Sequence, residues 1–262
     1  MRSGKVAAAF AVLLVVSFAV MNAMPSDTLP AALLQEAVLA LVAFAAVGFA
    51  IPDAHKRCTK SVQQWSIVRF ATIALLLVGL VGDAITLLAW LFAGGGTMAC
   101  FVSTALPSTA DLMENLLLLL GICLLTGLYE ESFMRVLGIE AFERALDTKR
   151  AILASAALFA LLHVGAPDVS AGQLVLLQAA LKFGQALLFG VILGALYVRT
   201  RRLWPCAFIH AGFDVLYMAP NVLLTGTMPE TYASGAVGDT VLLAVSVLML
   251  SGIVLKIRNE IA

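Results

Sequence analysis

The sequence predicts an all-α, polytopic membrane protein with about eight transmembrane helices. Of its 262 residues, 62% are hydrophobic and only 12% are charged, whereas a soluble domain carries about 25% charged residues. The mean hydropathy is +1.02. The apolar residues also come in long runs close to the roughly 20 residues that cross a bilayer. The third observation is that, among the connections between these runs, Lys and Arg occur only in alternate ones.

Eight apolar segments are candidate spans, and they lie at residues 6–24, 30–51, 66–93, 112–129, 151–165, 173–197, 204–224 and 237–257. The fifth segment is the shortest. The first resembles a signal peptide, because Arg2 and Lys5 precede its apolar run. We expect it to be retained as an anchor, since the run is long and the small-residue pattern near Ala23 is poor. Cleavage is the alternative, and it would leave the orientation of the later spans unchanged.

The charges of the connections test this assignment. Lys and Arg lie at both ends of the chain and in the connections 52–65, 130–150 and 198–203. They are absent from the alternate connections 25–29, 94–111, 166–172 and 225–236. The positive-inside rule therefore predicts a multi-pass protein of the cell membrane with both termini in the cytoplasm. An odd number of spans would destroy the alternation, so it supports the count of eight.

Composition also excludes some classes of protein. The formal net charge is zero, which argues against a nucleic-acid partner. The four cysteines show no CxxC spacing, so neither a disulfide framework nor a cysteine zinc site is expected. The short connections and the Ala/Leu/Val-rich composition indicate a prokaryotic source.

The first candidate site is a pair of adjacent carboxylates, Glu130 and Glu131, which follows the apolar run Leu116–Leu125. A charge near membrane depth costs a few kcal/mol, so it marks a functional site by default. If the helix continues, Glu131 and Arg135 are four residues apart and can pair on one face. Glu130 then points towards a different partner.

Two histidines in apolar surroundings are the candidate partners of Glu130. His163 lies four residues after Phe159, and His210 lies four residues before Asp214, so each pair shares one helix face. A lone intramembrane His is commonly an interhelical hydrogen-bonding residue. Two of them, together with the Glu pair and Asp214 on three different spans, predict a shared polar site. The third histidine, His55, lies in a basic connection and is expected to be solvated.

The predicted depths of Glu130 and His163 in the membrane differ. Glu130 falls near the cytoplasmic end of its span, whereas His163 lies 13 residues after Arg150, or about 20 Å along a continuous helix. Either the fifth span begins later and is tilted, or a water-filled cavity reaches into the membrane. Glu36 and Glu114 fall near the outer ends of their spans, where we expect them to reach the interface.

Three motifs occur in order on apolar segments, namely Glu130-Glu131-x-x-x-Arg135, Phe159-x-x-x-His163 and His210-x-x-x-Asp214. Together they resemble the CAAX prenyl protease and bacteriocin-processing (CPBP, or Abi) family of intramembrane proteases. The resemblance covers residues 112–220. This chain has Met134 and Val136 where the family often has Phe and Gly, and Asp214 where the eukaryotic prenyl proteases have Asn. The resemblance therefore implies a catalytic class, and not a prenylated substrate.

The resemblance implies an endopeptidase with an intramembrane catalytic cavity. Glu130 and His163 would activate a water molecule, and His210 and Asp214 would orient or stabilise the reacting group. The Glu131–Arg135 pair would hold the geometry of the site. The substrate would be a membrane-associated protein or peptide in contact with the lipid bilayer.

Both a metal-free and a zinc-dependent mechanism remain open at this point. Glu130, His163 and His210 form a His₂Glu set of the kind that binds catalytic zinc with an open water position. The sequence has no HExxH motif, in which a single helix supplies two zinc ligands. We favour the metal-free mechanism, in which the cofactor is absent.

The motifs divide the chain into three parts. Residues 1–111 hold three N-terminal spans and an outer loop, residues 112–224 hold the catalytic core of four spans, and residues 225–262 hold the last span and a cytoplasmic tail. Two alternatives to a protease remain. One is a proton-coupled transporter with Glu130, Asp83 and Lys182 as a relay, in which Asp83 and Lys182 can also form a structural pair. The other is a non-catalytic immunity or scaffold member of the family.

Overall fold

The computed structural model describes residues 2–52, 62–93, 107–164, 172–229 and 232–258. Within these ranges every regular element is a helix, which confirms the predicted fold class. The helices are α1 (Arg2–Ala23), α2 (Leu29–Ala50), α3 (Val62–Ala93), α4 (Thr109–Glu131), η3 (Ser132–Ile139), α5 (Glu140–Phe142), α6 (Thr148–Val164), α7 (Gln173–Thr200), α8 (Leu203–Thr225) and α9 (Val237–Ile257). His55, which was expected to be solvated, lies outside the described residues.

Seven helical stretches of the described residues are long and apolar enough to cross a membrane, judged by length and composition. They are Gly4–Ala23, Leu29–Ala50, Ser66–Ala89, Thr109–Phe142, Gln173–Thr200, Leu203–Thr225 and Val237–Ile257. The eighth predicted span corresponds to α6, whose described part has 17 residues, or about 25 Å at 1.5 Å per residue. The chain is therefore a polytopic membrane protein, and the crossing by α6 stays a prediction.

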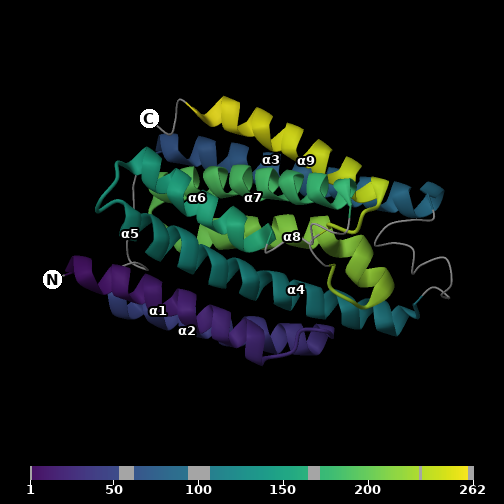
Figure 1. The fold of residues 1–262 in the computed structure, drawn as a ribbon, viewed down its shortest axis with the longest axis horizontal. Coiled ribbons are helices and arrows are strands. Elements are labelled where there is room, and N and C mark those ends of the chain that lie inside the picture. Colours follow the sequence, from purple (N-terminus) through teal and green to yellow (C-terminus); the bar gives the residue numbers. More distant parts are fainter. Residues whose placement is uncertain (1, 53–61, 94–106, 165–171, 230–231, 259–262) are drawn as a thin grey trace.

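The ends of the chain agree with an even number of passes. In Figure 1, α1 begins and α9 ends at the same end of an elongated bundle, and the long helices run roughly along its long axis. α6 contributes one of the passes along the bundle between α4 and α7. α6 packs on α7 and η3, so a helix too short to qualify by itself still belongs to the bundle.

The fourth predicted span is longer than its apolar run. α4 does not end after Tyr129; it continues as the π-helix η3 and then as α5 to Phe142. All eight residues of η3 are buried, so this stretch is a core element and not a connection at the membrane surface. π-helical segments are rare and frequently occur at functional sites. The extension places Glu130 well inside the bundle, which removes the predicted mismatch in depth with His163.

Glycines allow the helices around the site to approach closely. A Cβ atom on Gly127 of α4 would lie 2.6 Å from the carbonyl oxygen of Ala207 on α8. Similarly, a Cβ atom on Gly190 of α7 would lie 2.9 Å from the Cβ atom of Ala156 on α6. Any residue with a Cβ atom at either position would therefore clash with the facing helix. Consequently α4 packs directly on α8, and α6 packs directly on α7.

Candidate active site

Glu131 connects three elements at the centre of the bundle. Its Oε1 atom lies 2.8 Å from Nδ1 of His210 on α8, and its Oε2 atom lies 3.1 Å from Nε of Arg135 in η3. The side chains of Glu131 and Arg135 are 0% exposed. The predicted pairing of these two residues is therefore confirmed. Because both carboxylate oxygens of Glu131 are engaged, this residue positions its neighbours and has no oxygen left for a substrate.

Glu130 faces both intramembrane imidazoles. Its Oε1 atom lies 3.8 Å from Nε2 of His163, and its Oε2 atom lies 3.4 Å from Nε2 of His210. Its side chain keeps 17% of its surface exposed, in contrast to the fully enclosed Glu131. Three segments distant in sequence thus meet at one carboxylate, as the sequence predicted. Of the two adjacent carboxylates, Glu130 is the one that a water molecule or substrate can reach.

The hydrogen bonds of His163 fix its tautomer. Its Nδ1 atom lies 2.9 Å from the carbonyl oxygen of Phe159 one turn earlier in α6. A carbonyl can only accept, so Nδ1 carries the proton. In the neutral ring, Nε2 then has a free lone pair directed towards Glu130. His163 can accept a hydrogen bond from a water held beside Glu130, but it cannot donate one from Nε2 unless the ring is charged.

His210 lies between three carboxyl groups. Its Nδ1 atom contacts Glu131, and its Nε2 atom lies 3.4 Å from both Glu130 Oε2 and Asp214 Oδ2. The His210 side chain is 3% exposed, whereas that of Asp214 is 17% exposed. As an imidazolium, the ring can donate from Nδ1 to Glu131 and from Nε2 towards the space between Glu130 and Asp214. This geometry suits stabilisation of a negative charge that develops there.

Aromatic rings surround the polar groups. The ring centroids of Phe159 and His163 are 4.1 Å apart, and those of Phe189 and His210 are 4.8 Å apart in an edge-on arrangement. The guanidinium of Arg135 lies 4.7 Å from the ring centroid of Phe159. These contacts hold the imidazoles in fixed orientations and keep water from the Glu131–Arg135 pair, which strengthens their attraction.

A cavity of about 550 Å³ reaches Glu130 and His163. One wall comes from α1, and the remaining wall comes from α4, η3 and α6. The lining residues are Leu14, Ser17, Phe18, Met21, Asn22, Tyr129, Glu130, Phe133, Met134, Phe159, Leu161, Leu162 and His163. We name this cavity the α1 cleft. Its rim faces outwards, because Phe18 is 72% and Leu161 is 59% exposed.

All six predicted site residues converge here, namely Glu130, Glu131, Arg135, His163, His210 and Asp214. Of the relay in the transporter hypothesis, Lys182 lies near enough to Glu130 and Asp214 to interact with both electrostatically. Nζ of Lys182 lies 3.1 Å from Oε1 of Gln185 and 5.5 Å from the ring centroid of Tyr232. Among the described side chains, no ion pair joins Lys182 to Asp83.

Glu36 is a carboxylate of this region that the sequence did not reveal. It was expected at the membrane interface, and that prediction is wrong. Its side chain forms a hydrogen bond with Thr126 on α4 and interacts electrostatically with Asp214 and His210, and its Oε2 atom is buried. The sequence could not predict that Glu36 lies near the site, because tertiary contacts decide which face of α2 packs on α4.

The predicted zinc ligands match zinc in chemistry but not in arrangement. Both histidines direct Nε2 towards Glu130, and their Nδ1 atoms are held by other groups, as in zinc sites. Nevertheless, within the described part of the chain no group of three or more His, Cys, Asp or Glu side chains is placed so that it could hold a metal ion. The chemistry below is therefore derived from the protein groups alone.

Comparison with known protein families agrees with this geometry. Residues 112–216 match the family described as type II CAAX prenyl endopeptidase Rce1-like. This segment of the chain is thus similar to the CAAX protease family. The match begins in α4 and ends in α8, so the Rce1-like segment contains every predicted site residue. It does not contain α1 or α2, which supply the wall of the α1 cleft and Glu36. No curated protein matches the chain.

Proposed function

We propose that the protein is an intramembrane endopeptidase that hydrolyses a peptide bond with a water activated by Glu130 and His163. The observation that carries this proposal is the convergence of Glu130 on the Nε2 atoms of His163 and His210, at 3.8 and 3.4 Å. The Rce1-like match to a family of endopeptidases supports the same reaction class. The basic residues at both ends of the chain support cytoplasmic termini.

The groups have complementary tasks in this reaction. Water donates one hydrogen to Glu130 and the other to the lone pair of His163 Nε2. Glu130 removes the first proton as the water oxygen adds to the carbonyl carbon of the peptide bond. His210, as an imidazolium, donates from Nε2 to the oxyanion that forms. When the C–N bond breaks, Glu130 returns its proton to the leaving amine, so the enzyme ends in its starting state.

Asp214, Glu131 and Arg135 are positioning residues in this proposal. Glu131 holds Nδ1 of His210, and Arg135 holds Glu131. Asp214 lies 3.4 Å from Nε2 of His210, which is the same nitrogen that would donate to the oxyanion. Removing any of the three would reorient the imidazole and would lower the rate of the chemical step more than substrate binding.

The α1 cleft indicates what kind of substrate would reach the site. Its lining is mostly apolar, and its rim includes side chains such as Phe18 and Leu161 that face outwards from the bundle. An apolar segment of a membrane-associated protein or peptide would fit this cleft with its scissile bond beside Glu130. A polar peptide from solution would have to be desolvated there without compensating contacts.

The proposal is tested with the purified full-length protein in proteoliposomes. Membrane peptides that carry a fluorophore and a quencher on either side of an apolar segment report cleavage. We expect cleavage by the wild type and none by Glu130→Ala, His163→Ala or His210→Ala when each variant remains folded. Uptake of protons or solutes without any cleavage would favour the transporter instead.

A further inference from the structure

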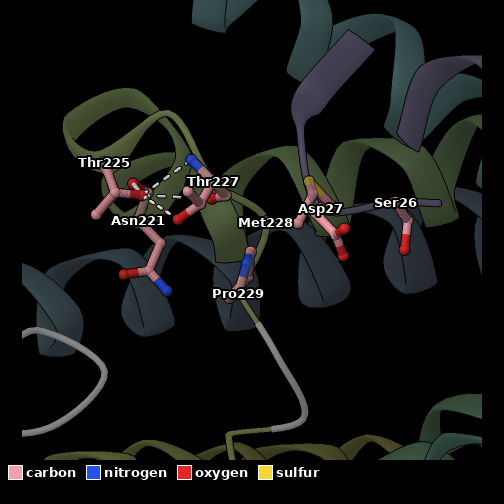
Figure 2. Close-up of a pocket in the computed structure, with 7 residues that line it drawn as sticks. All are labelled: Ser26, Asp27, Asn221, Thr225, Thr227, Met228 and Pro229. Carbon is pink, nitrogen blue, oxygen red and sulfur yellow. Dashed lines mark hydrogen bonds between the residues drawn. The ribbon is translucent and has the colours of Figure 1, made fainter. Parts of the chain in front are cut away.

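Polar side chains gather in two further regions of the bundle. One is a cavity of about 570 Å³ at the C-terminal end of α8 (Figure 2). In Figure 2 the carboxylate of Asp27 lies apart from the side chains of Asn221 and Thr227, so these groups do not converge on one ligand. The other region surrounds the ammonium group of Lys182 on α7, and there the polar groups are in mutual contact.

A chain of hydrogen bonds orients the side chain of Gln185. The hydroxyl of Ser246 on α9 donates to the carbonyl oxygen of Leu242 at 2.8 Å, so the Tyr217 hydroxyl, 3.2 Å away, must donate to Ser246. Tyr217 then accepts from Nε2 of Gln185 at 2.7 Å. Because the amide nitrogen is engaged there, Oε1 of Gln185 accepts from Nζ of Lys182 at 3.1 Å. Groups from α7, α8 and α9 thus fix the acceptor that holds this ammonium.

The ammonium of Lys182 lies within electrostatic reach of the candidate active site. Nζ is 5.5 Å from the ring centroid of Tyr232, which packs edge-on against Tyr217. Asp214 is three residues before Tyr217 on α8, so the two side chains share a helix face. From this position Lys182 interacts electrostatically with both Asp214 and Glu130. Within the described part of the chain no ion pair joins its ammonium to a carboxylate, so it acts on them through space.

His210 alone does not balance the carboxylates that face it. Its Nε2 atom lies 3.4 Å from both Glu130 and Asp214, and one imidazolium offsets one of these two negative charges. Glu36 of α2 also interacts electrostatically with Asp214 and adds to the negative charge on that side. An ionised carboxylate in apolar surroundings needs a counter-charge, because burial of an unpaired charge is costly. Lys182 brings a second positive charge to this group from α7.

We propose that Lys182 is the counter-charge of Asp214 and thereby lowers the barrier of the chemical step. This inference rests on the proposed function. In that reaction negative charge moves from Glu130 to an oxyanion beside Nε2 of His210, the nitrogen that also lies 3.4 Å from Asp214. An ionised Asp214 repels this oxyanion, and the ammonium of Lys182 offsets the repulsion. Lys182 therefore acts on the reaction through Asp214 without touching the substrate.

A double-mutant cycle of Lys182 and Asp214 tests this coupling with the full-length protein and the fluorophore–quencher peptides. Lys182→Met removes the positive charge and keeps most of the length of the side chain. Asp214→Asn removes the negative charge and keeps an oxygen beside His210. We expect Lys182→Met to lower kcat about tenfold at unchanged KM in the wild-type background, and less than about twofold in the Asp214→Asn background. Thermal unfolding of the same four proteins should show the same coupling, because Lys182→Met leaves a charge unpaired only where Asp214 is present.

Lys256→Met is the matched control, because Lys256 is an exposed lysine in the last turn of α9, and it should cleave and unfold like the wild type. Lys182→Gln is neutral but still polar, and it carries the test if Lys182→Met does not fold. Absence of cleavage by the wild type would refute the proposed function and the catalytic part of this inference, whereas the unfolding cycle would still decide the pairing. The inference is overturned if neutral Lys182 variants lose equally in both backgrounds, or if they lose neither kcat nor stability.

Discussion

Glu131 and His210 are joined by a contact of 2.8 Å between Oε1 and Nδ1, although 79 positions separate them in the chain. Glu131 also holds the buried guanidinium of Arg135 at 3.1 Å. One carboxylate thus links α4, η3 and α8 and orients the imidazole that faces Glu130. The two adjacent glutamates thus have different tasks. Glu131 positions His210, and Glu130 remains accessible to water and substrate.

Glu131→Gln should destabilise the protein strongly. The substitution leaves the guanidinium of Arg135 buried without a counter-charge, and breaking a buried ion pair costs about 3–5 kcal/mol. Thermal unfolding in detergent measures the loss. Arg150→Ala is the control, because the Arg150–Asp147 pair is 75% and 56% exposed and such pairs contribute at most about 1 kcal/mol. Equal stability losses in the two variants would contradict the role given to Glu131.

Gly127→Ala should reduce both stability and cleavage. The added methyl group would lie 2.6 Å from the carbonyl oxygen of Ala207, so α4 and α8 must separate and Glu131 must move away from His210. Overpacking of this kind costs about 1–3 kcal/mol. Gly252→Ala on α9 has no heavy atom within 4 Å of the new Cβ and should be neutral or slightly stabilising. Normal cleavage by a fully stable Gly127→Ala protein would argue against the close packing.

Met21→Trp should narrow the α1 cleft and weaken substrate binding. Met21 lines the cleft and is not one of the proposed catalytic groups, so we expect KM to rise about tenfold with little change in kcat. Initial-rate measurements over a range of peptide concentrations separate the two constants. Leu248→Trp, at a position on α9 that is 72% exposed, is the control. An unchanged KM in Met21→Trp would remove the cleft from the substrate path.

Removal of zinc should leave cleavage intact. The prediction follows from the arrangement of the described side chains, in which no three His, Cys, Asp or Glu groups are placed to hold a metal ion. Activity is measured after exhaustive chelation, and the metal content of the same preparation is assayed. Loss of activity that is restored by stoichiometric zinc would replace the metal-free mechanism with a metalloprotease.

Local sequence patterns predicted the parts of the site that depend on helical spacing. Glu131 and Arg135 are four residues apart, and so are His210 and Asp214, and each pair is in contact. The apolar runs predicted eight spans; seven of them match candidate spans among the described residues, and the crossing by α6 and the orientation from the basic connections stay predictions. The order of the motifs on apolar segments also predicted their convergence on Glu130, which the distances confirm.

Features that depend on packing between distant helices were not predictable. The π-helix at Ser132–Ile139 has an apolar composition that also fits an α-helix, and because it continues α4, Glu130 does not lie at a helix end. Glu36 was assigned to the interface by its position in the span, but its side chain contacts Thr126 inside the bundle. The wall that α1 adds to the cleft follows from its docking onto η3, for which no motif exists.

Substitution of Glu130 by Gln tests the central claim most directly. Gln has nearly the same shape as Glu but cannot take a proton from water, so the variant should fold normally and lose cleavage by a factor of at least about 10². Glu114→Gln, which changes a carboxylate outside the site, should cleave like the wild type. If Glu130→Gln in proteoliposomes cleaves a membrane peptide as fast as the Glu114→Gln control, Glu130 is not the general base and the proposed mechanism is wrong.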